Sequence, residues 1–357
     1  MRIVAAMSGG VDSSVAAALL ADAGHDVVGL SMQLYDQSDG TRSFGSCCTL
    51  DDLHDARRVA RRLGIPHYIV NFERQFDERV VSPFVQEYAA ARTPIPCVRC
   101  NSDLKFASLL DRARGFEARQ VATGHYARIE TLPAGNGSGP VRRLRRAVDA
   151  TRDQCYFLFS LTQSQLARAS FPLGRMLKSE VRDYAREHDL LVADKPDSRE
   201  ICFVPDGDYA TFVERRLAGA PRGGAVVDGG GRVLGRHHGV HRFTVGQRKG
   251  LGVSSAVPLY VTALDAATAT VTVGPRAALE RNTLTAGGVN WIEEPPRPGQ
   301  PVTAQIRHHH PPAPARVWPL DGAALRLEFD TPQPAIAPGQ AVVLYDDDIV
   351  VGGGWID

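Results

Sequence analysis

The most specific chemistry in this sequence lies in Ser8–Ser14, which reads Ser-Gly-Gly-Val-Asp-Ser-Ser. Gly9 and Gly10 let the backbone approach ligand oxygens closely, and the serines add hydroxyl donors. The segment follows an apolar strand and precedes a helix, whose first-turn N–H groups and dipole attract anions. Asp12 adds a carboxylate that could help to hold magnesium. The pattern predicts a phosphate-binding loop that is neither a Walker A loop nor a G-x-G-x-x-G loop.

Cys100 has the sequence setting of a reactive thiol. It is followed by Asn101 and Ser102, either of which could cap a helix that we expect from Asn101 to Arg114. A thiol at a helix N-terminus, with a cation such as Arg99 beside it, has a lowered pKa and a larger thiolate fraction. We therefore predict that Cys100 is a nucleophile.

The remaining cysteines are less informative. Cys202 follows a Pro-containing turn and lies on a predicted loop, where a catalytic role and a packing role both remain open. Cys155 begins an apolar run and is expected in the core. Cys47 and Cys48 precede a predicted helix and have no identifiable partner.

Cys97 and Cys100 form a C-x-x-C pair. A structural zinc site needs four ligands and usually a second such pair. The adjacent Cys47 and Cys48 would be awkward ligands, so the sequence disfavours zinc.

The charge of the chain gives a local rather than a global signal. The net charge is only +1, which does not indicate a nucleic-acid partner. One short stretch, 142–152, nevertheless contains five arginines and a single carboxylate, Asp149. The arginines are Arg142, Arg143, Arg145, Arg146 and Arg152. Such a stretch could neutralise phosphates or could be a solvated face, and both interpretations stay open. No apolar run has the length of a membrane span, and the chain opens with a strand pattern rather than a signal peptide, so we expect a cytoplasmic protein.

The elements that must position these residues alternate between strand and helix over the first 200 residues or so. We predict strands at 3–7, 27–32, 67–70 and 120–123, and helices at 11–20, 51–63, 77–91, 101–114 and 177–188. This order predicts an α/β fold with a doubly wound parallel sheet, which binds ligands at the carboxyl ends of its strands. A loop at 132–140, rich in Pro and Gly, joins a predicted hairpin of 126–131 and 141–149.

The pattern changes at about residue 209. After a short predicted helix at 209–217, short alternating strands are separated by Gly and Pro turns. We predict a small central β-rich domain and then a C-terminal β-barrel. The expected domains are 1–207, 208–277 and 278–357.

Six segments together resemble one family. They are AMSGGVDSS (6–14), TPIPCVRCN (93–101), TGHYAR (123–128), RDQCYFL (152–158), KPDSREICF (195–203) and FTVGQRKGLG (243–252). In this order they resemble the bacterial tRNA-specific 2-thiouridylases, which belong to the PP-loop ATP pyrophosphatases with an adenine nucleotide α-hydrolase-like fold. The resemblance covers nearly the whole chain.

The resemblance implies an ATP-dependent sulfurtransferase that uses ATP with magnesium. This family adenylates the 2-carbonyl oxygen of the wobble uridine in tRNAs for Lys, Glu and Gln, and a persulfide sulfur then displaces AMP. The resemblance further implies that Cys202 carries the persulfide and that Cys100 attacks it, which leaves a transient disulfide between the two cysteines. The implied ATP contacts are Ala6, Met7, Ser8, Gly9, Gly10, Val11, Asp12, Ser13, Met32 and Gly124.

The resemblance also implies contacts with tRNA. Ile95, Pro96 and Cys97 match the segment that meets the target base; the other matched positions are Arg152, Asp153, Gln154, Arg307 and His308. The family often has Asn-Pro-Asp or Asn-Pro-Cys where this chain has Ile95-Pro96-Cys97, so the acid/base role given to that Asp is unsupported here. His308 replaces a common Tyr, although a His can also stack on a base.

A metal site in the run His308–His310 is disfavoured, because consecutive residues of a strand point to opposite faces.

Three alternatives remain. Another PP-loop enzyme, such as a ligase that adenylates a small molecule, would share the loop but would not need Cys100 and Cys202. A non-catalytic RNA-binding protein would not need Asp12, Ser13 or the two cysteines. An iron–sulfur cluster on Cys97, Cys100 and Cys202 is possible but not favoured. The sulfur donor could be a cysteine desulfurase or a relay protein, and family likeness suggests a monomer.

Overall fold

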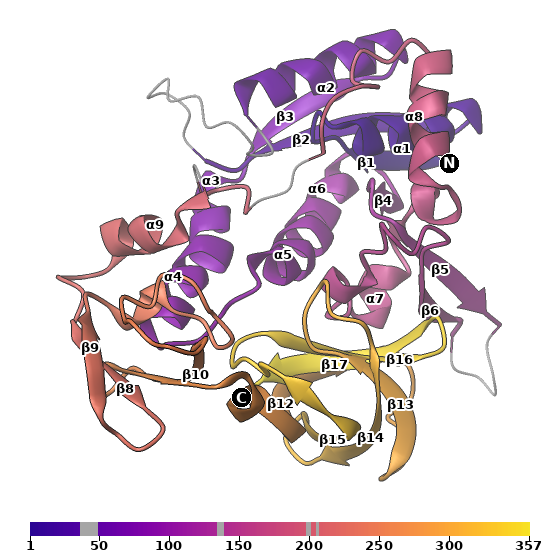
Figure 1. Cartoon of the computed structure of the whole chain (residues 1–357). Coiled ribbons are helices and arrows are strands. Elements are labelled where there is room, and N and C mark those ends of the chain that lie inside the picture. The colour runs from indigo at the N-terminus through magenta and orange to yellow at the C-terminus, as the bar shows by residue number, and fades with distance from the viewer. Residues whose placement is uncertain (36–48, 134–138, 198–200, 205–206) are drawn as a thin grey trace. The chain divides into compact units, whose positions relative to one another are not determined.

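The computed structural model describes residues 1–35, 49–133, 139–197, 201–204 and 207–357. The chain divides into two compact units (Figure 1). Unit 1 comprises 1–80, 97–207 and 348–350, and unit 2 comprises 81–96, 208–347 and 351–357. The boundaries that we expect after residues 207 and 277 remain a prediction.

Unit 1 is built on a five-stranded sheet in which every neighbouring pair is parallel, with the order β3-β2-β1-β4-β7. Its strands are β1 (Arg2–Ala6), β2 (Asp26–Gln33), β3 (His67–Asn71), β4 (Gln120–Ala122) and β7 (Ala169–Ser170). The chain places β2 and β3 on one side of β1, and β4 and β7 on the other. The carboxyl ends of β1, β2 and β4 therefore form the point at which such sheets bind ligands.

Three helices of unit 1 lie on one face of this sheet: α1 (Val11–Asp22), α2 (Leu50–Arg62) and α8 (Lys178–Glu187). Their apolar residues share one core with Ile3 and Ala5 of β1. A capping box starts α2, because the Thr49 hydroxyl accepts from the Asp52 amide and the Asp52 carboxylate accepts from the Thr49 amide. These elements confirm the predicted parallel α/β fold.

The rest of unit 1 contains the predicted hairpin of β5 (Ala127–Leu132) and β6 (Val141–Arg146), which pair antiparallel. The helix predicted at 77–91 begins earlier and has three parts, α3 (Glu73–Phe76), the π-helix η1 (Asp77–Val81) and α4 (Ser82–Ala89), of which α4 belongs to unit 2. The other helical elements are α5 (Pro96–Arg99), the π-helix η2 (Cys100–Ser108), α6 (Leu109–Gly115), η3 (Cys155–Phe157), α7 (Gln163–Leu166) and η4 (Pro172–Arg175).

Unit 2 contains a four-stranded sheet and a barrel. The sheet has the order β10-β11-β8-β9 and follows helix α9 (Tyr209–Arg216); its strands are β8 (Gly224–Asp228), β9 (Val233–His237), β10 (Tyr260–Asp265) and β11 (Thr270–Gly274). Turns η6 (Val240–Arg242) and η7 (Arg276–Leu279) complete this part.

The barrel has six strands in the order β12-β15-β14-β13-β16-β17 and closes through pairing of β12 with β17. The strands are β12 (Glu280–Trp291), β13 (Gln300–Gln305), β14 (Ala313–Leu320), β15 (Ala324–Pro334), β16 (Ala341–Asp346) and β17 (Ile349–Ile356). Alternate apolar residues such as Val317, Leu327 and Leu344 are fully buried inside it. The predicted C-terminal β-barrel is confirmed.

Among the described residues, no helix combines the length and the apolar character that crossing a membrane requires.

Candidate active site

The predicted phosphate loop lies between the central strand β1 and helix α1. Gly9 has a φ of +76°, and a Cβ there would lie 2.1 Å from the carbonyl oxygen of Asp52. Only glycine fits both constraints. Gly10 is the N-cap of α1 and supplies no side-chain cap, so the first-turn N–H groups of the helix remain available to an anion.

Hydroxyl groups hold the loop in shape. The Ser13 hydroxyl accepts from the Ser8 amide at 3.1 Å, donates to the Gly10 carbonyl at 3.1 Å and lies 3.2 Å from the Ser8 hydroxyl. The Ser14 hydroxyl donates to the same Gly10 carbonyl at 2.9 Å. The loop is therefore organised by its own side chains, which lowers the cost of ordering it around a ligand.

The other two positions matched to ATP also lie at this edge of the sheet. Met32 is near the end of β2, and Gly124 follows β4. A Cβ on Gly124 would come within 2.6 Å of the Ser13 amide nitrogen and 2.7 Å of the Asp12 carbonyl carbon. Gly124 thus permits the close approach of this strand end to the start of α1. That these residues contact ATP remains a prediction.

Asp12 is held by two side chains that the sequence did not identify. The Lys178 ammonium donates to both of its carboxylate oxygens, at 2.7 and 2.8 Å, and the Tyr126 hydroxyl donates to Oδ1 at 2.8 Å. Burial and the neighbouring Asp12 charge raise the pKa of Tyr126, so this phenol stays a donor. The Lys178 ammonium already balances the Asp12 carboxylate in this structure, and the contact of Asp12 with magnesium remains a prediction.

Lys178 also links Asp12 to Asp197. Its ammonium lies 2.9 Å from Oδ1 of Asp197, and its side chain is only 10% exposed. The same carboxylate pairs with Arg152 at 2.8 Å and with Arg182 at 3.2 Å. Burial alone would raise the pKa of Asp197, but the hydrogen bond and charge of Lys178, with the two arginines, lower it. We call these five residues the Asp12–Asp197 network.

A second lysine joins the same stretch of chain to the loop. The Lys195 ammonium donates to the Gly9 carbonyl at 3.0 Å and to the carboxylates of Asp52 and Asp55, both at 2.6 Å. Burial opposes its charge, but these two carboxylates outweigh burial and raise the pKa of Lys195. Lys195 and Asp197 therefore fix the chain beside the loop shortly before Cys202.

The structure corrects the predicted setting of Cys100. Helical backbone begins at Pro96, and α5 continues directly into the π-helix η2, so Cys100 is not at a helix N-terminus. Proline at the first position starts the helix early, and Asn101 donates to the Phe157 carbonyl at 3.1 Å instead of capping. Cys100 is buried, whereas Cys97 in the first helical turn is exposed. The position predicted for Cys100, at a helix N-terminus, is thus held by Cys97. π-Helical turns recur at functional sites.

Cys202 lies five residues beyond Asp197 and is half-buried. The next residue, Phe203, is buried. Its ring packs edge-to-face against that of Phe76, with the two ring centroids 5.5 Å apart. Among the described residues, no three His, Cys, Asp or Glu side chains form a group able to hold a metal ion, and this includes the cysteines considered for an iron–sulfur cluster. Cys47, Cys48 and the segment 198–200 lie outside the described residues.

The tRNA candidates of unit 1 have partners within the protein. Arg152 pairs with Asp197. Asp153 accepts from the Ala147 amide at 3.0 Å and pairs with Arg146 at 3.2 Å. The Gln154 side-chain oxygen Oε1 accepts from the Tyr126 backbone amide at 2.9 Å. Asp153 and Gln154 therefore shape the backbone here, and any contact with RNA is an additional role that remains a prediction.

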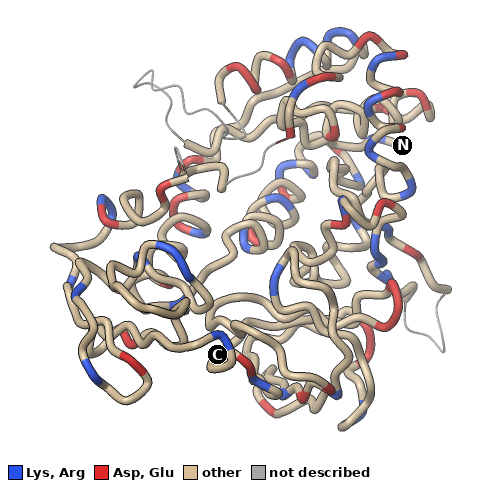
Figure 2. Tube along the Cα trace, viewed as in Figure 1, with Lys and Arg blue, Asp and Glu red and all other residues tan. Residues whose placement is uncertain are grey.

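The basic stretch of β6 is partly neutralised inside unit 1. Arg145 pairs with Asp348 at 2.8 Å and with Glu130 at 2.9 Å. Arg146 pairs with Asp153, so Asp149 is not the only acidic residue near the stretch. Figure 2 shows acidic segments beside the basic ones in this part of the chain. Cys155, expected in the core, is fully buried, and burial raises the pKa of its thiol.

The candidates of unit 2 lie in two places. Ile95 is partly buried and precedes α5, and Pro96 is buried and begins it. Arg307 and His308 lie in a turn after β13. The side-chain Nε2 of Gln305 donates to the backbone carbonyls of both residues, at 3.0 and 2.6 Å. The assumption that His308–His310 is a strand was wrong, although no metal-holding group occurs among the described residues.

Sequence reasoning missed the residues that connect the loop to the cysteine segment. Tyr126, Lys195 and Asp197 lay within recognised motifs but had no assigned role, and Lys178 was not singled out. One signal was present for Lys178: it stands in the first turn of a helix, where the dipole disfavours a cation unless a carboxylate faces it.

Three family models match the chain. The description of the first is tRNA methyl transferase HUP domain, and it matches residues 1–206. A tRNA methyl transferase PRC-barrel domain matches 210–275, and an aminomethyltransferase beta-barrel domain matches 281–356.

Full-length relatives share about half of their residues with this chain. The tRNA-specific 2-thiouridylase MnmA of Geotalea uraniireducens is 51% identical over 360 residues, which cover 100% of this chain and 95% of that protein. The protein of the same name from Solibacter usitatus is 53% identical over 371 residues and covers 99% of each. Among solved structures, a 4-thiouridine synthetase–RNA complex with bound ATP is 16% identical, with a TM-score of 0.35, over 60% of this chain and 50% of that one.

Proposed function

The chain belongs to the family of tRNA-specific 2-thiouridylases, and we propose that it uses ATP to replace O2 of the wobble uridine in tRNAs for Lys, Glu and Gln with sulfur. The observation that best supports this mechanism is the Asp12–Asp197 network, which joins the phosphate loop to the stretch of chain that leads to Cys202. An enzyme that activates an oxygen and then delivers sulfur needs these two functions in one place.

In the first step, O2 of the uridine attacks the α-phosphorus of ATP and pyrophosphate leaves. Oxygen at C2 is a poor leaving group, whereas the adenylated oxygen departs as AMP. The first-turn N–H groups of α1 and the hydroxyls of Ser8 and Ser13 would hold the phosphates. Lys178, which balances Asp12 in this structure, is close enough to the loop to offset phosphate charge.

In the second step, Cys202 carries a sulfane sulfur as a persulfide. The Cys100 thiolate attacks the Cys202 sulfur, a disulfide forms between the two cysteines, and hydrosulfide leaves. The hydrosulfide adds to C2 of the adenylated uridine, AMP departs and 2-thiouridine results. A dithiol reductant must then supply two electrons to reopen the disulfide. Burial of Cys100 keeps this thiol from competing oxidants until the persulfide approaches.

The remaining roles complete the proposal. The matched positions Ile95, Pro96, Cys97, Arg152, Asp153, Gln154, Arg307 and His308 contact the tRNA, and the enzyme acts as a cytoplasmic monomer. The sulfur comes from a cysteine desulfurase, directly or through a relay protein.

The test is a thiolation assay with unmodified tRNA, ATP and a cysteine desulfurase, read as 2-thiouridine by mass spectrometry. The wild type should form 2-thiouridine, and Cys202→Ser should form essentially none while it still releases pyrophosphate in the presence of tRNA. Cys100→Ser should accumulate a persulfide on Cys202 without turnover. Equal thiolation by wild type and Cys202→Ser would exclude the persulfide role. Pyrophosphate release without thiolation by the wild type would favour an adenylating ligase.

A further inference from the structure

The segment from 229 to 264, which contains β9 and the loop between β9 and β10, has an unusual concentration of positive charge. Between Asp228 and Asp265 the chain contains no Asp or Glu, yet it has five basic residues, Arg232, Arg236, Arg242, Arg248 and Lys249. The whole chain has a net charge of only +1, so this excess is local. A solvated surface normally mixes both signs, which makes the segment atypical.

Two of these five cations are already neutralised. Arg232 pairs with Asp228 at 3.1 Å, and Arg242 pairs with Glu214 at 2.7 Å. Arg236, Arg248 and Lys249 are exposed, and within the described part of the chain none of them forms an ion pair. Three cations of unit 2 are therefore available to an external anion.

The segment Thr244–Gly252 is held in one conformation although it is exposed. The Gln247 side chain accepts from the Thr244 amide at 3.0 Å and donates to the Lys249 carbonyl at 2.9 Å. The backbone pairs with β10, since the Gly246 amide donates to the Val261 carbonyl at 2.8 Å and the Val261 amide donates to the Gln247 carbonyl at 2.9 Å. Leu251 is buried in the core of the small sheet. Arg248 and Lys249 thus extend from a preorganised loop.

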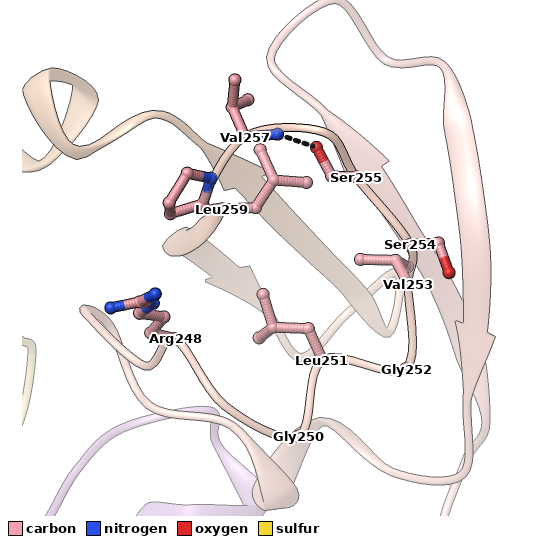
Figure 3. Close-up of a pocket in the computed structure, with 10 residues that line it drawn as sticks. Arg248, Gly250, Leu251, Gly252, Val253, Ser254, Ser255, Val257 and Leu259 are labelled. Carbon is pink, nitrogen blue, oxygen red and sulfur yellow. Dashed lines mark hydrogen bonds between the residues drawn. The ribbon is translucent and has the colours of Figure 1, made fainter.

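This loop separates two hollows of unit 2. The larger has a volume of about 840 Å³ and includes Arg236, His238 and Arg242 in its lining, and the smaller has a volume of about 340 Å³ and includes Arg248. Gly250, Leu251 and Gly252 line both. Figure 3 shows the side chains of Leu251, Val253 and Leu259 turned toward one another in the smaller hollow, with Arg248 to one side of them.

We propose that this loop, together with Arg236 of the adjoining strand β9, binds the phosphodiester backbone of the RNA substrate, with Arg248, Lys249 and Arg236 each facing a phosphate; the inference rests on the proposed function. Arginine and lysine neutralise phosphates without reading the base sequence. Gly250 and Gly252, both with positive φ, let the RNA strand approach the protein backbone closely. The apolar side chains of the smaller hollow suit the carbon face of a ribose. None of these residues belongs to the unit that carries the phosphate loop and the two candidate cysteines.

The experiment measures the dissociation constant of unmodified tRNA as a function of salt for wild type and for Arg248→Ala/Lys249→Ala. Each lost phosphate contact weakens binding by about 5-fold near 0.15 M salt and lowers the slope of log K against log salt by about 0.9. The double variant should therefore bind about 25-fold more weakly, with a slope smaller by about 1.8.

Two matched variants sharpen the test. Arg232→Ala removes a charge from the same segment that Asp228 already neutralises, and it should leave the slope unchanged. Arg248→Lys keeps the charge and should retain most of the affinity. If the double variant binds tRNA with the wild-type constant and slope, the proposal is wrong. It is also wrong if tRNA binding is unchanged but sulfur transfer from the donor protein is lost, because the loop would then dock a protein. Failure of wild type to thiolate tRNA would instead count against the proposed function, since binding is measured separately.

Discussion

Replacing Asp197 with Asn tests whether the Asp12–Asp197 network stabilises unit 1. The change keeps the size of the side chain but removes the negative charge that Lys178, Arg152 and Arg182 share at 2.9, 2.8 and 3.2 Å. Lys178 keeps its two bonds to Asp12 and does not become an isolated buried charge. The variant therefore weakens the network without disrupting the phosphate loop.

The size of the effect follows from burial. The Asp197 side chain is 20% exposed and that of Lys178 is 10% exposed. A hydrogen bond to a charged group contributes about 1.5–3 kcal/mol, whereas an exposed ion pair contributes about 0–1 kcal/mol. Arg152 is 43% exposed and should add little. We expect Asp197→Asn to lower the free energy of unfolding by about 2 kcal/mol at neutral pH.

The effect should depend on pH in one direction. The network lowers the pKa of Asp197 below its ordinary value of 3.8, so its stabilisation is complete above that value and is lost as the pH falls through the folded-state pKa. The difference in stability between wild type and Asp197→Asn should thus be constant from about pH 6 to 8 and should shrink in acid.

Urea unfolding followed by circular dichroism at 222 nm measures this difference. Tryptophan fluorescence is unsuitable, because Trp291, Trp318 and Trp355 all lie in unit 2. Asp194→Asn is the matched control, since the side chain of Asp194 is 81% exposed in its pair with Arg186 and should change stability by less than about 0.5 kcal/mol. If both variants lose the same small amount, the reasoning from burial fails.

Two further changes probe the loop and its second lysine. Gly9→Ala should abolish ATP binding in calorimetry and lower the free energy of unfolding by at least about 2 kcal/mol, because the new Cβ would meet the Asp52 carbonyl. Gly24→Ala is the control, since Gly24 has the same φ of +76° but a Cβ there would have no neighbour within 4 Å. This control should lower the free energy of unfolding by only about 1 kcal/mol and leave ATP binding intact. Lys195→Met should lower the free energy of unfolding in urea by about 2 kcal/mol. Because the pKa of Lys195 is raised, this loss of stability should be constant from pH 6 to 9. A loss of stability that grows through this range would contradict the assigned ion pairs.

Local patterns predicted most elements of unit 1. The strand predicted at 3–7 and the helices predicted at 11–20 and 51–63 depend on patterns among neighbours in the chain. The structure has the matching elements β1 (Arg2–Ala6), α1 (Val11–Asp22) and α2 (Leu50–Arg62). The start of the helix before Cys100 was predicted wrongly, because Pro96 initiates a helix that tertiary packing then continues through a π-helical turn.

The sequence by itself determined the parallel sheet and the barrel and predicted the phosphate loop and the two candidate cysteines, because periodicity, glycine positions and short motifs are local properties. Only the tertiary structure decided which charges meet. Asp12, Lys178 and Asp197 are separated by 166 and 19 positions, and Lys195 reaches Gly9 across 186 positions. No spacing rule predicts such pairs, since they depend on the packing of α8 and the chain after it against α1 and α2. Burial then gives those charges their strength.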